Sequence, residues 1–280
     1  MAQQSLAAIT LLQADGTTLA LSNPAESIVT LAPNLAELVF AAGAGERLTA
    51  VVEYSNFPKE VNQLPRVGDA FRIDLERIME LSPDLVIAWQ SGNPPGALQK
   101  LEQLGLAVWR IEITRPEQIA SSVEQISIAA GTAAHGQVVA GQLRDRLQKL
   151  KKTNADKAPV SFFYQVSHRP LFTVNGQHII SRGLELCAAS NIFSELTTLA
   201  PQVSREALVA ADPQVMIAPQ VEGDPLDPEA WRAWPGLQAG THRALLYVPA
   251  DEISQATPRM LDSREWACEL LNPVRQSIKE

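Results

Sequence analysis

The sequence contains little cysteine. Cys187 and Cys268 are the only two cysteines among 280 residues. They form no CxxC pair and lack the spacing of a zinc site, which argues against a thiolate metal centre or a dithiol redox motif. The residues themselves leave two alternatives open. Either both are buried, inert thiols, or in an oxidising compartment they form one long-range disulfide in the second half of the chain.

Long hydrophobic runs are also missing. No apolar stretch approaches the roughly 20 residues that span a bilayer, so a soluble chain is expected. The first ten residues, MAQQSLAAIT, lack the positively charged start and apolar segment of an export signal. The chain is therefore expected to be cytosolic, or to have lost an export signal.

Positive charge is in the minority, with 23 Lys and Arg against 31 Asp and Glu. The densest basic run, KLKKTNADK (149–157), is interpreted as a solvated helix end. Without a basic tract to neutralise phosphates, a nucleic-acid partner is excluded.

Catalytic signatures are absent as well. The sequence has no GxxxxGK[ST], GxSxG or HExxH motif, and AGAGERL (42–48) lacks the third glycine of a dinucleotide fingerprint. The four histidines are scattered without ligand spacing, and the acidic pair Asp251 and Glu252 has no nucleophile beside it. We therefore expect no enzyme activity, no metal and no cofactor. A metal- or nucleotide-dependent α/β enzyme stays the alternative from another class.

What the sequence does contain is an alternation of strand and helix patterns, with 46% hydrophobic residues to build cores. Strands are predicted at 27–32, 48–54, 84–89, 107–112, 160–166 and 243–249, and helices at 33–44, 75–81, 94–106, 182–191 and 258–271. Residues 116–152 have a helical pattern with a break near Gly131. This order predicts an α/β fold with mostly parallel sheets: an N-terminal lobe (1–132), a connecting helix (133–154) and a C-terminal lobe (155–280).

One segment occurs twice. IDLERIMELSPDLVIAWQ (73–90) and VSREALVAADPQVMIAPQ (203–220) share a helix–proline–strand design at a constant offset of 130 residues. Asp74 and Ser204 are predicted N-caps, which puts Glu76 and Glu206 in the first turn, where a carboxylate stabilises the positive helix end. A repeat in each half indicates two related lobes. Two exposed acids at equivalent places also suit docking on a partner with two basic pockets.

Aromatic residues make up only 5% of the chain, yet three of them follow predicted strands or turns in the first half. Tyr54, Phe71 and Trp89 are these residues. Because ligands bind at the carboxyl ends of parallel strands, the three indicate a site that stacks a flat, partly apolar ligand.

Several strings together resemble a known family. They are IVTLAPNLAELVFAAGAGERLTAVVEYSNFP, DLERIMELSPDLVIAW, LELCAASNIF, PQVSREALVAADPQVMIA and ATPR, and they fall in the family's order over about residues 27 to 271. The family is the helical-backbone (class III) periplasmic binding proteins of bacterial ABC importers, and the likeness is greatest to its corrinoid-binding members. The resemblance implies two Rossmann-like lobes joined by one long helix, with a ligand cleft between them. It also implies a monomer that delivers a small molecule to a permease dimer and its ATPase subunits.

Residue roles follow from the same resemblance. Glu76 and Glu206 match the glutamates that dock on the permease. Cys187 and Cys268 match a disulfide pair, which implies the periplasm and a removed export signal.

The ligand implied by the resemblance is cobalamin or a related corrinoid. Tyr54, Trp89 and Asp251 match ligand contacts. Two aromatic contacts are replaced by Ala70 and Ala200, with Phe71 as a substitute beside the first, and an arginine is replaced by Gln255. Haem or a ferric siderophore is the rival ligand within the family. If haem is the ligand, its axial ligand is expected to be Tyr54, Tyr164 or His168.

Overall fold

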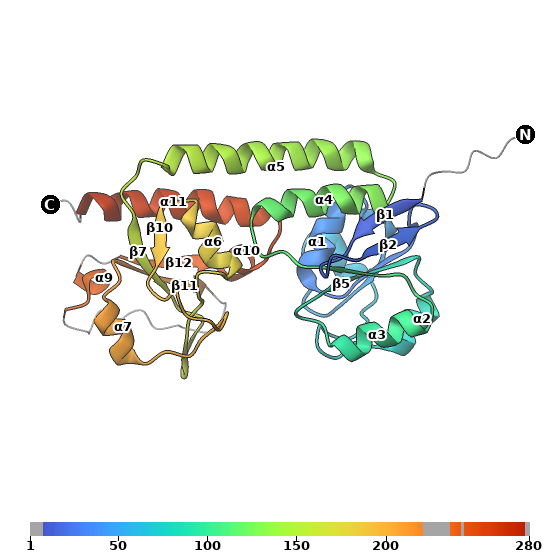
Figure 1. Cartoon of the computed structure of the whole chain (residues 1–280), viewed down its shortest axis with the longest axis horizontal. Coiled ribbons are helices and arrows are strands. Elements are labelled where there is room, and N and C mark those ends of the chain that lie inside the picture. The colour runs from blue at the N-terminus through green and yellow to red at the C-terminus, as the bar shows by residue number, and fades with distance from the viewer. Residues whose placement is uncertain (1–7, 221–235, 242–243, 278–280) are drawn as a thin grey trace, which may run out of the picture. The chain divides into compact units, whose positions relative to one another are not determined.

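The computed structural model describes residues 8–220, 236–241 and 244–277, and its elements are drawn in Figure 1. The chain divides into two compact units. Unit 1 comprises Met1–Ile113 and Glu117–Arg144, and unit 2 comprises Thr114–Pro116 and Asp145–Glu280. Among the described helices, none is long and apolar enough to cross a membrane.

Unit 1 is built around a parallel sheet of four strands in the order β4-β3-β5-β6. The strands of unit 1 are β1 (Ile9–Leu12), β2 (Thr18–Leu21), β3 (Ile28–Thr30), β4 (Leu48–Val51), β5 (Leu85–Trp89) and β6 (Val108–Ile111). Its helices are α1 (Pro33–Ala41), α2 (Leu75–Leu81), α3 (Pro95–Gln103) and α4 (Glu117–Ala129), with short 3-10 turns at Gly45–Arg47 and Lys59–Gln63. The strands are buried along almost their whole length, as expected for a parallel sheet covered on both faces.

Unit 2 contains a second parallel sheet, in the order β10-β7-β11-β12. Its strands are β7 (Val160–Tyr164), β8 (Ser167–His168), β9 (Leu171–Phe172), β10 (Ala189–Asn191), β11 (Val215–Gln220) and β12 (Leu245–Pro249). Its helices are α6 (Ile179–Glu185), α7 (Arg205–Ala211), α9 (Gln238–Thr241), α10 (Ala250–Ser254) and α11 (Arg259–Ser277). When the strands of each sheet are numbered by their order along the chain, they lie side by side in the order second, first, third, fourth in both sheets. The α/β fold with two parallel-sheet lobes is therefore confirmed.

Helix α5 (Ala133–Asn154) contains the boundary between the units, which falls between Arg144 and Asp145. With 22 residues it is about 33 Å long. Its N-terminal part is tied to unit 1 by an ion pair from Arg144 to Glu124 of α4. Its C-terminal part is tied to unit 2 by Arg146, which pairs with Asp262 and Glu265 of α11 at 2.6 and 3.1 Å.

The repeated segment has the same structure in both units. Helices α2 and α7 occupy equivalent positions, and the side chains of Asp74 and Ser204 accept hydrogen bonds from the third-residue amides, as predicted for N-caps. Each helix ends on a left-handed residue, Ser82 (φ 45°) or Asp212 (φ 40°), before the proline. The repeat predicted from the sequence is confirmed at the level of helix, cap and strand.

One predicted helix was wrong. A single helix was predicted at 182–191. The structure instead has α6, which ends at Glu185, followed by strand β10, which pairs in parallel with β7. Ala188 has a positive φ of 53°, which breaks the helical path. Pairing with β7 overrides the local helix preference of the alanines, a long-range effect that periodicity does not contain. The sequence also gave no prediction for hairpin β1–β2 or for α10. Of the predicted strand 243–249, Arg243 lies outside the described residues.

Candidate functional site

Tyr54 follows β4 and is the most exposed large apolar side chain that the structure describes, at 82%. Its φ of 65° is unusual for a residue with a side chain and costs about 1 kcal/mol or more. The preceding amide, that of Glu53, donates to the carbonyl of Gly68 at 2.8 Å. The backbone thus holds Tyr54 outward in a conformation that local preference alone does not favour.

Phe71 stands at the tip of a tight loop, Gly68 to Ile73, which closes through an antiparallel bridge between those two residues. The Asp69 carboxylate accepts hydrogen bonds from the amides of Phe71 and Arg72 at 2.7 and 2.8 Å. Gly68 has a φ of +82°, and a Cβ there would lie 2.1 Å from the carbonyl oxygen of Arg72, so glycine is required. This aromatic loop (68–73) presents Phe71 with 70% of its surface exposed.

Trp89 ends β5 and is half-buried. Its indole Nε1 donates to Glu112 Oε1 at 3.2 Å, while Glu112 Oε2 accepts from the amide of Ser91 at 2.9 Å. Gly92 lies against the indole, because a Cβ built there would come within 1.8 Å of the ring atom Cε3. The ring is therefore fixed in direction by a hydrogen bond on its edge and a glycine against its face.

The three aromatic side chains predicted as ligand contacts in unit 1 lie at or after the carboxyl ends of its strands. Trp89 is the last residue of β5, and Tyr54 and Phe71 lie in the segment between β4 and α2. Tyr54 and Phe71 are largely exposed, so each offers a ring face for stacking. No group of three or more His, Cys, Asp or Glu that could hold a metal occurs among residues 8–220, 236–241 and 244–277. The chemistry that this edge offers is aromatic contact, with Glu112 committed to Trp89.

Unit 2 has a pocket of its own with a volume of about 270 Å³. Ala200, Pro219 and Ala250 contribute apolar surface, and Ser254, Tyr164 and His178 contribute polar groups. Val166, Val174 and Ile180 complete the lining. Pro219 belongs to β11 and Ala250 follows β12, so the pocket opens where strands of this sheet end. Sequence reasoning missed the pocket because its lining comes from segments far apart in the chain.

Burial controls the charge of the polar lining. It raises the pKa of the Tyr164 phenol well above its usual value of 10, so the hydroxyl stays protonated. It also lowers the pKa of His178 to about 4, and the charge of Arg264 acts in the same direction. Arg264 itself is completely buried, and burial lowers the pKa of its guanidinium to about 10. At neutral pH the two titratable side chains that line the pocket are therefore uncharged.

Asp251 and Gln255, the predicted polar contacts, lie on and at the end of α10. Asp251 is in the first turn and exposed, and the amide of Gln255 donates to its carbonyl at 3.2 Å. Gln255 Oε1 is buried and has no hydrogen-bond partner among the described residues. Ala250 and Ser254, one residue before each, line the pocket. Asp251 and Gln255 are therefore chain neighbours of two residues that line the pocket.

Glu76 and Glu206 occupy the same position in α2 and α7, and both are exposed. The pKa of Glu206 is lowered by hydrogen bonds from its own backbone amide and from Ser204. Within the part of the chain that the structure describes, no salt bridge engages either carboxylate. Both carboxylates lie at the surface, where a partner can reach them.

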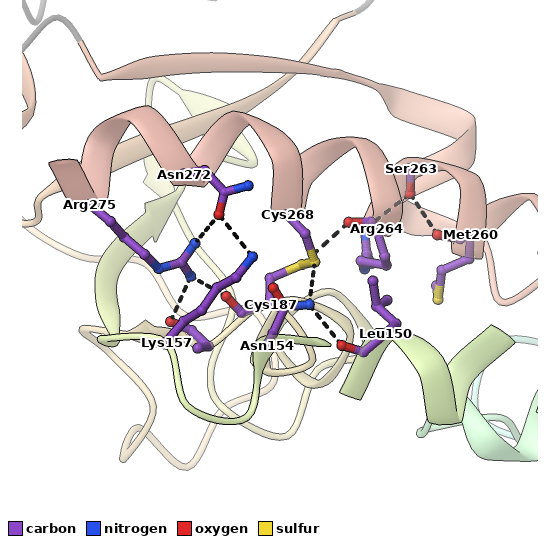
Figure 2. The surroundings of a disulfide bond; sticks show 11 residues. Leu150, Asn154, Lys157, Cys187, Met260, Ser263, Arg264, Cys268, Asn272 and Arg275 are labelled. Atoms are coloured by element: carbon purple, nitrogen blue, oxygen red, sulfur yellow. Dashed lines mark hydrogen bonds between the residues drawn. A yellow bond between two sulfur atoms is a disulfide. The ribbon is translucent and has the colours of Figure 1, made fainter. Parts of the chain in front are cut away.

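Cys187 and Cys268 form a disulfide with a Cα–Cα distance of 4.9 Å, and Figure 2 shows its surroundings. It joins the segment after α6 to the middle of α11. Next to it, Asn154 Nδ2 donates to the carbonyl of Leu150 at 2.8 Å and lies 3.5 Å from Cys268 Sγ. The Arg275 guanidinium contacts the Cys187 carbonyl and donates through Nε to that of Ala158 at 2.9 Å. Of the two alternatives that the residues left open, the structure has the disulfide.

Two parallel-sheet lobes, a helix containing their boundary and aromatic side chains at strand ends are features of a protein that binds a ligand. The model of the periplasmic binding protein family matches residues 28–235. The chain belongs to this family.

Its relatives include a vitamin B12-binding protein of Vibrio cholerae, which is 38% identical over 249 residues, covering 89% of this chain and 90% of the relative. A solved structure of the periplasmic vitamin B12-binding protein of Vibrio cholerae matches with a TM-score of 0.83 and 36% identity, over 90% of this chain and 99% of that one. The periplasmic haem-binding protein HutB of Vibrio cholerae shares the fold, with a TM-score of 0.77 at 22% identity, over 88% of this chain and 99% of that one.

Proposed function

We propose that this protein is the periplasmic component of an ABC importer that binds cobalamin or a related corrinoid, without catalysing a reaction on it. The observation that carries the proposal is the trio Tyr54, Phe71 and Trp89 at one sheet edge of unit 1. A corrinoid is a large, nearly planar ring with an apolar body and polar amide groups at its rim. Exposed aromatic rings suit its body, and the identity of about two fifths to a vitamin B12-binding relative supports the same ligand class.

In this proposal residues of both units contact the ligand. Tyr54, Phe71 and Trp89 contact its face or edge from unit 1. Asp251 and Gln255 bond its rim amides from unit 2. Gln255 Oε1 supports this role, since it is buried with no hydrogen-bond partner among the described residues and gains from a donor that the ligand brings. The unit 2 pocket receives an apolar, uncharged part of the ligand.

We further propose that Glu76 and Glu206 dock on basic pockets of the permease dimer, whose ATPase subunits then drive uptake. Their equivalent places in two related units support this role. Carboxylates on exposed helix ends contribute steering and register more than affinity.

Haem is the second candidate, because relatives with the same fold bind it. Its axial ligand would come from Tyr54, Tyr164 or His168. Tyr164 is disfavoured as a phenolate ligand because burial raises its pKa. Tyr54 is exposed and stays open to this role.

The test is isothermal titration of the purified protein with cyanocobalamin, haemin and a ferric siderophore. We expect saturable binding of cyanocobalamin at one site, and binding of the other two weaker by about a hundredfold or more. Tighter binding of haemin, with a Soret band that changes in Tyr54→Phe, would replace the corrinoid by haem. Binding of none of the three would reject the ligand class.

A further inference from the structure

We propose that Asn93 is the positioning residue that holds the aromatic side chains of unit 1 in place for the ligand. Asn93 follows β5 and is only 2% exposed. Its Nδ2 donates to the carbonyl of Leu31 at 2.8 Å and to that of Ala70 at 2.9 Å, and its Oδ1 accepts from the amide of Trp89 at 2.7 Å. One side chain thus bonds three separate backbone segments. This inference rests on the proposed function for its link to the ligand.

Each partner of Asn93 belongs to a different part of the candidate site. Leu31 directly follows β3, one of the two inner strands of the sheet. Ala70 lies in the aromatic loop (68–73), next to Phe71. Trp89 is itself a predicted contact, and the loop carbonyl of Gly68 accepts from Glu53, the neighbour of Tyr54. Asn93 therefore connects the core to Trp89 and to Ala70, the neighbour of Phe71, and through the loop to the neighbour of Tyr54.

Packing does not hold the tip of the aromatic loop, although Ile73 at its end packs against the core. Phe71 at its tip is 70% exposed, so little apolar burial fixes its position. The hydrogen bonds inside the loop set its shape, but they do not join it to the sheet. The bond from Asn93 to Ala70 does so from the buried side.

The chemistry requires an asparagine. Two carbonyls need two donors on one nitrogen, and the Trp89 amide needs an acceptor on the same short side chain. Aspartate keeps the acceptor but has no N–H for the carbonyls, and alanine leaves all three groups unpaired. A buried polar group without a partner is costly, so the loop is expected to move away and find water.

The test compares Asn93→Asp with Thr132→Val. Thr132 lies in the same unit and its Oγ1 donates to the carbonyl of Ala42 at 2.7 Å, so valine removes a hydrogen bond of similar quality. Ala42 follows the end of α1, a helix that starts where β3 ends and runs back to the opposite edge of the sheet. All measurements are made equally far below each variant's melting temperature, which removes the effect of overall stability.

Hydrogen exchange is the first readout and needs no ligand. In Asn93→Asp we expect the amides of Asp69 and Asp74 to exchange about tenfold faster or more, while those of the β3 strand stay protected. Thr132→Val should leave the aromatic loop unchanged. Equal protection of the loop in Asn93→Asp and the wild type would overturn the inference, whatever the ligand proves to be.

Affinity for cyanocobalamin is the second readout. We expect Asn93→Asp to bind about tenfold more weakly than the wild type and Thr132→Val to bind equally well. In a double-mutant cycle, Phe71→Ala should weaken binding much less in the Asn93→Asp background than in the wild type, because the loop is already displaced. Additive losses would sink the positioning role. A wild type that fails to bind would reject the corrinoid proposal and leave the exchange result to decide on Asn93.

Discussion

At the scale of the residue, the candidate site depends on a few aromatic side chains that the backbone holds at the surface. Tyr54 has a positive φ and Phe71 stands at a loop tip, yet both expose large apolar surfaces to water. Such exposure costs stability and is typical of contact surfaces. Trp89 differs, since its indole is already bonded to Glu112 and so loses little freedom when a ligand arrives.

Trp89→Ala should weaken cyanocobalamin binding by about 1 kcal/mol or more, roughly fivefold, because an oriented aromatic contact is lost. Isothermal titration measures the change. Trp266→Ala is the matched control, since Trp266 is a partly exposed tryptophan of α11 away from the strand ends. The same affinity in Trp89→Ala and the wild type would remove Trp89 from the site.

His178 should make the stability of unit 2 depend on pH. Its pKa is near 4 in the folded chain and near 6.5 in the unfolded chain, so only the unfolded chain takes up the proton between these values. Its contribution to stability is complete above pH 6.5 and is lost as the pH falls towards 4, by at most about 1.4 kcal/mol per pH unit.

The measurement is denaturant unfolding of the wild type and His178→Asn at pH 7, 6 and 5. Asparagine keeps an acceptor for the amide of Ile180, which now donates to His178 Nδ1 at 3.2 Å, but it does not titrate. The free-energy difference between the two proteins should shrink or change sign towards pH 5. A difference that is constant with pH contradicts the buried, neutral histidine.

At the scale of the element, the two copies of one helix–proline–strand unit each have a side-chain N-cap, a left-handed residue at the helix end and a glutamate at the same position. Asp84 and Gln214, which follow the two prolines, also make equivalent contacts. Asp84 Oδ2 accepts from the amide of Ser27 at 2.9 Å, and Gln214 Oε1 accepts from that of Ser161 at 2.8 Å. Each contact joins the start of the sheet's third strand along the chain, β5 or β11, to the start of its first strand along the chain, β3 or β7. The unit therefore repeats as a structural element as well as a sequence pattern.

Glu76→Gln combined with Glu206→Gln should leave cyanocobalamin affinity unchanged and lower transporter-coupled uptake about tenfold, because each docking contact loses its charge. Glutamine is chosen because it keeps the size and the helix propensity of glutamate. Uptake by permease and ATPase reconstituted in vesicles is the measurement.

The control for this pair is Glu60→Gln with Glu195→Gln, which removes the same charge from one exposed site in each unit. Uptake with the control should equal that of the wild type. At high salt, screening weakens docking of the wild type, so the difference in uptake between the wild type and the docking variant should become smaller. Normal uptake with the docking pair rules out the role of Glu76 and Glu206.

At the scale of the whole molecule, each unit has its own parallel sheet and its own buried hydrophobic core, which stabilises the fold of that unit. In unit 2 the disulfide adds a covalent link between the segment after α6 and α11, across 81 residues of sequence. Closing so long a loop restricts the unfolded chain strongly.

Reduction of the disulfide should lower the free energy of unfolding of unit 2 by about 2–5 kcal/mol. Thermal unfolding with and without a reductant measures this, with Cys187→Ser plus Cys268→Ser as the control that a reductant cannot affect further. We expect unit 1, which has no cysteine, to melt at the same temperature in all samples. An unchanged transition for unit 2 after complete reduction would show that the link adds nothing.

Much of the fold could be predicted from the sequence, because its signals are local. Asp74, Ser204 and the two prolines mark helix ends by hydrogen bonding and steric exclusion within a few residues. The apolar runs of β5 and β11 are long enough to identify buried strands. Strand β10 could not be predicted, since its three residues, Ala189, Ser190 and Asn191, become a strand only by pairing with β7. The disulfide was expected only through the family resemblance, because the residues alone left two buried free thiols open as the alternative.

The sequence by itself determined the two related α/β units, their capped helices, the paired acids and the exposed aromatic residues, since each depends on neighbours in the chain. Only the tertiary structure decided how Asn93 joins three of these segments, which residues line the unit 2 pocket and where α10 puts Gln255. The physical reason is that hydrogen bonds and burial between distant segments have no local signature. Leu31 and Asn93 are 62 positions apart, and only folding brings the carbonyl of one to the amide of the other.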